Sequence, residues 1–400
     1  MDSRRLERSL KDVGKIGVTP SHGVSRLALD DADKEARDLL VSWFTELDLE
    51  VRVDPIGNIF AIRRGQSDAD PILIGSHIDT VKDGGTFDGA LGVLGALEVI
   101  RTLDDENLET ARPVAVAVFT NEEGARFQPD MMGSMVFTGR LDIEEAYQSM
   151  DDEGLTVGRE LERIGYKGED SVVPSCFLEL HVEQGPILHN TNHQIGVVVG
   201  VQGISWWHGC YEGQANHAGT TPIGLRRDAL LGASDLNVRL RALGEELSEA
   251  SVVTMGRLHP YPDVINVVPG RADFTVDFRQ YAQDIFTEGK RKVETLIEDV
   301  AKHHRLEWSM RQLADAQPVR FDSRMVELVE SKARELGLGY MRMPSGAGHD
   351  AQFLSYVCPT AMIFVPSIGG LSHCPEERTR YADCVNGANV LLECVQLLGR

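Results

Sequence analysis

Histidine and carboxylate side chains follow four apolar runs of the chain, each near the point where a run ends. His77 closes PILIGSH, Glu122 and Glu123 follow PVAVAVFTN, and His181 closes SCFLELH. His373 lies in the loop after the fourth run, TAMIFVP. Imidazole and carboxylate groups without thiolate are ligands that zinc, manganese, cobalt or nickel take in hydrolytic sites. These residue types therefore indicate a metal-dependent hydrolase.

Asp88 adds a fifth candidate ligand. It lies eleven residues after His77, directly before a helical apolar pattern. An aspartate at that position commonly caps the helix, and its carboxylate can cap with one oxygen and bind metal with the other. Five ligands exceed what one open catalytic zinc takes and suit two ions that share a carboxylate. The set therefore predicts a centre for two divalent metal ions.

Two further carboxylates accompany the candidate ligands. Asp79 lies two residues after His77, so both side chains point the same way on an extended chain. An imidazole that binds metal usually donates its other N–H to a carboxylate, which fixes the tautomer. Glu122 and Glu123 are adjacent, so their side chains diverge. One of them can bind metal while the other holds a proton.

The elements that must position these side chains form an α/β pattern. Apolar runs at residues 71–77, 113–121 and 175–181 alternate with helical stretches, as expected of strands buried on both faces. Residues 30–47 predict a surface helix, and residues 49–65 predict a hairpin. We therefore expect an α/β domain with a mixed, largely parallel sheet and helices on both faces.

The pattern changes after about residue 208. Helical periods near 226–244 and 284–304 are interleaved with strand-like segments, and the α/β pattern resumes near residue 321. A sheet that stops and restarts around another unit implies a discontinuous domain. We expect a metal-binding catalytic domain over 1–208 and 321–400, interrupted by an inserted α+β lid and dimerisation domain over 209–320.

The net charge of the chain limits which partners are expected. The chain has 62 acidic and 40 basic residues, for a formal net charge of -22, and only 9 of the bases are lysines. Nucleic-acid binding needs a basic face, so no nucleic-acid partner is expected. An acidic surface with so few lysines indicates one of two causes. The first is ordinary solubility together with the base composition of the genome, and the second is adaptation to a saline environment.

The cysteines and the apolar runs indicate in which cellular compartment the protein is expected. The six cysteines form no C-x-x-C pair, so reduced and mostly buried thiols are expected. Cys374, next to His373, is expected to be a buried small residue, with competition for soft metal as the alternative. The charged start MDSRRLERSL and the absence of a long apolar run predict a cytoplasmic protein without a membrane span.

A series of strings in the right order carries a family resemblance: GSHIDT, TFDGALG, FTNEEGARF, LELHVEQGP, GQANHAGTTP, INVVPG, GAGHDA and SHCPEE. Through them the chain resembles the group of N-carbamoyl-L-amino-acid amidohydrolases, allantoate amidohydrolases and β-ureidopropionases. This group belongs to the dinuclear-metal aminoacylase and carboxypeptidase superfamily. The resemblance runs from about residue 55 to 385, and HVEQGP and NHAGTTP are specific to this branch.

The resemblance implies a role for each residue of the predicted centre, and two divalent ions (Zn, Mn, Co or Ni) as cofactors. In that assignment, His77 and His181 bind one ion, Glu123 and His373 bind the other, Asp88 bridges both, Asp79 supports His77, and Glu122 is the general base.

The resemblance also implies how substrate is held. His217 is implied to reach the active site of a partner subunit, so the expected active unit is a homodimer whose inserted domain closes over substrate. The planar guanidinium of Arg279 suits an α-carboxylate, although spacing alone favours an ion pair with Asp277. The implied substrate contacts are Gln184, His217, Asn266, Arg279 and His349.

The implied reaction is hydrolysis of the ureido C–N bond of an N-carbamoyl-L-amino acid to the L-amino acid, ammonia and carbon dioxide. The alternative substrates are allantoate, β-ureidopropionate, a dipeptide and an N-acyl amino acid, whose hydrolysis would need the same metals. An alternative of a different class is a non-catalytic binding protein that retains the fold. The complete set of candidate ligands with Glu122 argues against that alternative.

Overall fold

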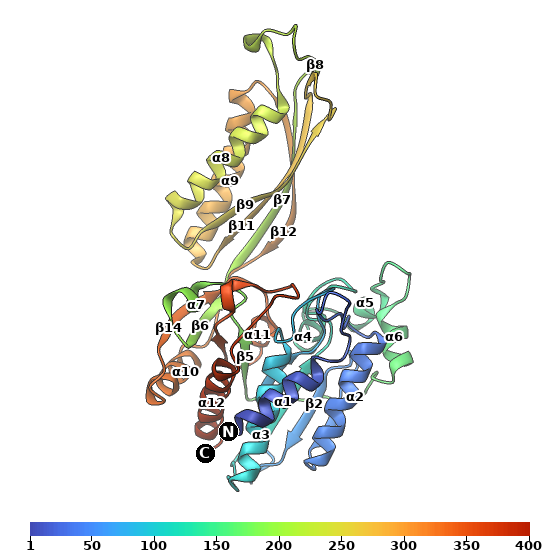
Figure 1. Ribbon diagram of the computed structural model, residues 1–400, viewed down its shortest axis with the longest axis vertical. Coiled ribbons are helices and arrows are strands. Elements are labelled where there is room, and N and C mark those ends of the chain that lie inside the picture. The colour runs from blue at the N-terminus through green and yellow to red at the C-terminus, as the bar shows by residue number, and fades with distance from the viewer. The chain divides into compact units, whose positions relative to one another are not determined.

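The computed structural model describes residues 1–400 as two compact units. The first comprises Met1–Gly200 and Arg320–Arg400, and it contains both termini (Figure 1). The second comprises Val201–Val319. The boundary expected at residues 208 and 209 falls inside strand β7 (Gly203–Glu212), because the segment ISWWHGC extends the sheet of the second unit.

A nine-stranded sheet forms the centre of the first unit. Four neighbouring strands are parallel and wholly buried, in the order β4 (Val114–Phe119), β3 (Ile72–His77), β5 (Cys176–Val182) and β15 (Thr360–Val365). Antiparallel strands flank them, so the sheet is mixed. The predicted α/β class with a mixed sheet is confirmed. The remaining strands are β1 (Glu50–Val53), β2 (Ile59–Arg63), β6 (Ile195–Val201), β13 (Val319–Arg320) and β14 (Tyr340–Ser345), of which β2 and β6 are the antiparallel neighbours of the parallel set.

Helices pack against this sheet where apolar periodicity predicted them. The predicted surface helix at 30–47 is α2 (Asp31–Glu46), capped by the carboxylate of Asp30. Helix α3 packs on β3 and β5, and α12 packs on β15. The helices of this unit are α1 (Ser3–Val13), α2, α3 (Ala90–Asp105), α4 (Met132–Phe137), α5 (Ile143–Gln148), α6 (Val157–Ile164), α7 (Ile187–Thr191), α10 (Ser323–Glu335), α11 (Asp350–Leu354) and α12 (Tyr381–Leu398), with a 3₁₀ turn at Ile368–Gly370.

The second unit is a four-stranded antiparallel sheet covered by two helices. Its order is β12 (Glu307–Ala316), β7, β11 (Arg271–Gln280) and β9 (Val252–Tyr261). Figure 1 shows α8 (Ala229–Leu247) and α9 (Gln283–His303) side by side on this sheet. Trp207, Tyr211 and Phe274 belong to the core between the two layers. A two-stranded sheet, β8 (Asn216–His217) and β10 (Val267–Val268), and a 3₁₀ turn at Ile223–Leu225 complete the unit.

The cysteine side chains form no disulfides. All six cysteines are unpaired, as predicted, and five are buried. Cys374 is only half-buried, which corrects its expected burial, because the loop that carries it lies at the surface. No helix is both long enough and apolar enough to span a membrane.

A buried ion pair ties α2 to the end of β4. Arg37 bonds Asp33 at 2.8 Å, and both side chains are fully buried. The same guanidinium donates to the carbonyl of Gly57 at 2.7 Å and to the hydroxyl of Thr120 at 3.2 Å. Because Thr120 directly follows β4, this contact fixes the loop that begins with Glu122.

We predict that Arg37→Met lowers the free energy of unfolding of the first unit by about 3–5 kcal/mol, because it removes the cation that is paired with the buried Asp33 carboxylate. Urea unfolding followed by circular dichroism measures the loss. Arg52→Met is the control, since Arg52 and Glu50 form an exposed pair that contributes at most ~1 kcal/mol. Equal midpoints for the two variants would contradict the prediction.

Candidate metal centre

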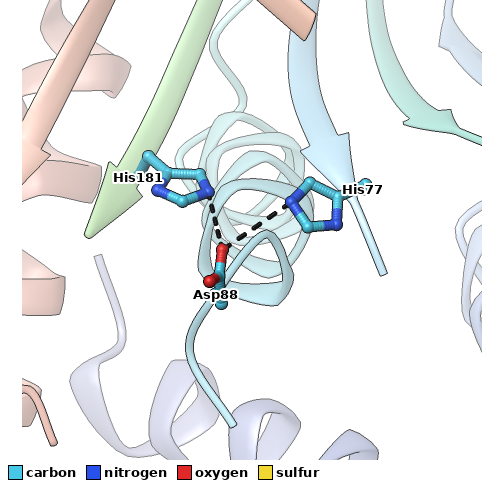
Figure 2. Close-up of side chains that lie close together, drawn as sticks. All are labelled: His77, Asp88 and His181. Atoms are coloured by element: carbon cyan, nitrogen blue, oxygen red, sulfur yellow. Dashed lines mark ion pairs between the residues drawn. The ribbon is translucent and has the colours of Figure 1, made fainter. Parts of the chain in front are cut away.

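The carboxyl ends of the four parallel strands lie at one edge of the sheet, and their side chains converge on Asp88. His181 Nε2 lies 3.1 Å and His77 Nε2 lies 3.8 Å from Asp88 Oδ1 (Figure 2). His373 Nε2 lies 3.3 Å from the other oxygen, Oδ2. A carboxylate whose two oxygens face different ligand groups has the arrangement of a bridge between two ions.

Glu123 completes the second group. Its Oε2 lies 3.3 Å from His373 Nε2, while its Oε1 is buried and has no hydrogen-bond partner. Within each group, His77 with Asp88 and His181, and Asp88 with Glu123 and His373, the candidate ligand atoms lie within 4.8 Å of one another. A buried acceptor without a donor is what a carboxylate presents where a cation binds.

Main-chain contacts orient both buried histidines. The Nδ1 of His77 lies 3.0 Å from the carbonyl of Asp79, and the Nδ1 of His181 lies 2.9 Å from the carbonyl of Val182. An imidazole that donates through Nδ1 leaves the Nε2 lone pair for a cation, or for the N–H of Gly89, which lies 3.2 Å from His181 Nε2. Gly89 permits the close approach, because a Cβ there would lie 2.4 Å from the His77 ring.

Asp79 supports the centre in a different way from the one expected. Its carboxylate lies 3.7 Å from His77 Nδ1, farther than its own carbonyl. It accepts the backbone N–H groups of Glu122 at 3.2 Å and Glu123 at 3.3 Å. Because β3 ends at His77, the chain turns and the Asp79 side chain meets the loop after β4. Asp79 thereby orients the two glutamates.

The predicted N-cap role of Asp88 is wrong. Helix α3 begins at Ala90, its N-cap residue is Gly89, and no side chain caps it. The positive φ of Gly89, 61°, turns the chain between Asp88 and the helix. Both Asp88 oxygens therefore face side chains of the centre rather than the N–H groups of the helix.

Electrostatics favour a cation at the centre. Burial, together with Asp350 and other carboxylates, raises the pKa of Glu122 well above its usual range, and burial with Asp88 does the same for Glu123. Burial lowers the pKa of His181, but the contact with Asp88 outweighs it and raises that pKa to about 9. A divalent ion competes with such a proton for the same lone pair. The nitrogen and oxygen donors, without thiolate, therefore fit two divalent ions.

Two residues that the resemblance assigned to substrate lie in the first unit, in different environments. Gln184 Nε2 donates to Asp88 Oδ2 at 2.9 Å, and Gln184 Oε1 is buried without a partner. His349 is only 1% exposed, with its Nε2 3.0 Å from the Ser345 hydroxyl and its ring 4.5 Å from that of His181. Gln184 therefore borders the ligand groups, whereas His349 packs behind His181.

The other three assigned residues lie in the second unit. His217 pairs with Val267 across β8 and β10, and Ala218 donates its N–H to the carbonyl of Asn266, so His217 and Asn266 are neighbours. Both side chains are exposed. Arg279, on β11, bonds Asp277 at 3.0 Å, which is the ion pair that spacing alone favoured.

Sequence reasoning missed Arg26, which is 1% exposed. Its guanidinium donates to the carbonyl of Ile78 at 2.6 Å and to the carbonyls of Val13 and Ile16. These bonds hold the segment that follows His77 against the end of α1. No local signal distinguishes a buried arginine that binds only carbonyls from a solvated one.

Several known proteins are similar to this chain in sequence and in structure. The family model described as peptidase family M20/M25/M40 matches residues 73–397. An N-carbamoyl-L-amino-acid amidohydrolase of Rhizobium meliloti is 39% identical, over 99% of this chain and 96% of that protein. An allantoate amidohydrolase of Bacillus subtilis is 31% identical, over 96% and 95%. A crystal structure of an amidase of the hydantoinase/carbamoylase family from Burkholderia multivorans is 42% identical, covers 100% and 98%, and has a TM-score of 0.98.

We predict that chelator-treated protein binds two divalent ions per chain, and that His77→Ala or His373→Ala each removes one of them. Each variant deletes one ligand from one group and leaves the other group with its full set. Calorimetric titration with Zn²⁺ or Co²⁺ measures the stoichiometry. Glu122→Gln is the control and should retain both ions, because Glu122 belongs to neither group. A His373→Ala protein that binds both ions with unchanged affinity would refute the assignment.

Proposed function

This chain belongs to the M20/M25/M40 peptidase family, and from that premise we propose that it is a metal-dependent amidohydrolase of N-carbamoyl-L-amino acids. It cleaves the ureido C–N bond and releases the L-amino acid, ammonia and carbon dioxide. The observation that carries the proposal is the position of Asp88, whose two oxygens face two ligand groups with Glu122 at their edge. The relatives' names supply the substrate class.

Two divalent ions, drawn from zinc, manganese, cobalt and nickel, are the proposed cofactors. His77, Asp88 and His181 would hold one ion, and Asp88, Glu123 and His373 would hold the other. When bound, such ions polarise the carbonyl oxygen and increase the acidity of water.

Glu122 is the proposed general base. Its Oε2 lies 3.4 Å from His77 Nε2, but the residue is in neither ligand group. Its neighbour Glu123 instead directs Oε2 to His373 Nε2, at 3.3 Å. Glu122 therefore takes a proton from the attacking water and returns it to the leaving nitrogen.

His217 is the proposed stabiliser of the developing oxyanion. Its Nδ1 accepts the N–H groups of Gly219 at 2.9 Å and Thr220 at 3.2 Å. A neutral ring held in this way carries its proton on Nε2, which becomes a hydrogen-bond donor. Such a donor, already oriented, stabilises negative charge on the carbonyl oxygen without reorganisation.

Arg279 and Asn266 are proposed to bind the substrate carboxylate and amide. The guanidinium is planar and can bind a carboxylate through two parallel hydrogen bonds. Asp277 already orients it at 3.0 Å, so substrate would share an arginine that is held in place. Gln184 is proposed to contact the ureido group from the first unit, where its buried Oε1 has no partner. His349 is proposed to act through His181 rather than by direct contact.

We propose a homodimer formed through the second unit. Strand β9 is the edge of its sheet, and its Val252 and Tyr261 are exposed. Val238 of α8 is 71% exposed beside a groove of about 590 Å³ between α8 and β9. An exposed edge strand with apolar side chains is a surface suited to pairing with a second copy. His217 would then contribute to the metal centre of the partner subunit.

The unpaired cysteines support a cytoplasmic location.

We predict that protein reconstituted with Mn²⁺, Co²⁺, Ni²⁺ or Zn²⁺ releases ammonia from N-carbamoyl-L-methionine. The rate should exceed that with the D-enantiomer by at least about 100-fold, because Arg279 would bind the carboxylate in one orientation only. Allantoate, β-ureidopropionate and N-acetyl-L-methionine, the last assayed for acetate, are the comparison substrates. Preferred turnover of allantoate or β-ureidopropionate would keep the mechanism and replace the substrate. No turnover with both ions bound would refute the function.

We predict that two inactive variants complement each other. Glu122→Gln and His217→Ala should each lower turnover about 100-fold or more. An equal mixture of refolded chains should regain about a quarter of wild-type activity, because half of the dimers would be mixed and each would hold one complete centre. Glu122→Gln mixed with His77→Ala is the control and should regain none. Absence of recovery in the first mixture, with mixed dimers present, would rule out the shared site.

A further inference from the structure

Glu377 is a fully buried carboxylate that neither the ligand groups nor the proposed reaction uses. Its Oε1 accepts the backbone N–H groups of Phe87 at 2.9 Å and Asp88 at 3.2 Å. Its Oε2 accepts the hydroxyl of Ser372 at 2.8 Å. All three donors lie in segments that carry candidate ligands.

Through these bonds one side chain, 289 residues from Asp88 in sequence, joins two parts of the centre. One part is the segment that ends in Asp88, and the other is the loop that carries His373. His373 itself has a φ of 56°, a conformation that a non-glycine residue keeps only when its surroundings impose it. The hydrogen bond between Glu377 and Ser372, the residue before His373, is part of those surroundings.

The packing around Glu377 leaves it little freedom. A Cβ at Gly85 would lie 2.1 Å from Glu377 Oε1, so only glycine fits there. On its other side the same segment is held by two backbone hydrogen bonds between Val24 and Gly84. The position of Asp88 is therefore set from both sides, and Glu377 supplies the side that connects it to His373.

We propose that Glu377 is a positioning residue that sets the spacing between Asp88 and His373. It thereby sets the affinity for the ion that these residues would hold with Glu123. This inference rests on the proposed metal centre. It assigns the effect to the length and hydrogen bonds of the side chain rather than to its charge.

The hydroxyl of Ser372 explains why hydrogen bonding rather than charge is decisive. It lies 2.8 Å from Glu377 Oε2 and 3.2 Å from Asp88 Oδ2, and it has one proton to donate. A glutamine at 377 would still accept from Phe87 and Asp88 through its carbonyl, and its amide would donate to Ser372. An aspartate would keep the charge but is one methylene too short to reach both segments.

The test is Co²⁺ titration of chelator-treated protein, followed by calorimetry and by the visible absorption of the bound ion. We expect Glu377→Ala and Glu377→Asp to bind one of the two ions about 10–100-fold more weakly, as is typical when the partner that orients a ligand is lost. Glu377→Gln should bind both ions as the wild type does. Thermal unfolding of the metal-free variants separates stability from metal affinity.

Glu98→Ala is the matched control. Glu98 is also fully buried and also joins distant segments, through Arg5 and the N–H of Asp2, but it contacts no candidate ligand. It should lower the unfolding temperature and leave both affinities unchanged.

Wild-type affinity in Glu377→Asp would overturn the proposal, and so would a loss in Glu377→Gln equal to that in Glu377→Ala. If Glu377→Ala does not fold, the aspartate and glutamine variants decide alone. The readout needs no substrate, so the proposed function can fail on the substrate panel while this inference holds.

Discussion

The buried carboxylate of Asp88 is the point on which the rest of this structure depends. Two histidines face one of its oxygens and a third faces the other, in a region where Glu122 and Glu123 add two further buried carboxyl groups. Such a concentration of acid is unfavourable in a low-dielectric interior unless cations compensate it. The order of the parallel strands creates the concentration, because β4, β3, β5 and β15 are neighbours whose carboxyl ends share one edge.

The surrounding elements hold that edge in place. Arg37 fixes the end of β4, and Arg26 fixes the segment after β3. Glu377 joins the segment that ends in Asp88 to the loop that carries His373. Each uses a buried charged side chain to form hydrogen bonds with main-chain groups. The groups proposed to bind substrate belong mostly to the second unit, whose own core is independent of these contacts. The candidate metal ligands and most of the residues proposed to bind substrate are thus carried by separately packed parts of one chain.

Much of the fold was predictable because its signals are local. Runs such as 71–77 and 175–181 became buried parallel strands, and the period at 30–47 became α2 capped by Asp30. The domain boundary was placed about eight residues late, since the pattern ISWWHGC does not reveal which sheet it joins. Asp88 was misjudged as a helix cap for a similar reason: the turn at Gly89 depends on the ring of His77 packed against it.

The amino-acid sequence by itself determined which groups could bind metal, since residue type and position after an apolar run are local properties. His77, His181 and His373 could be identified in this way. Only the tertiary structure decided which residues support these groups. It shows that Asp79 orients the glutamates, that His349 packs behind His181, and that Glu377 connects Asp88 to the loop of His373. Those roles depend on contacts between residues far apart in the chain. Only the order of the strands brings such residues together, and no local pattern records it.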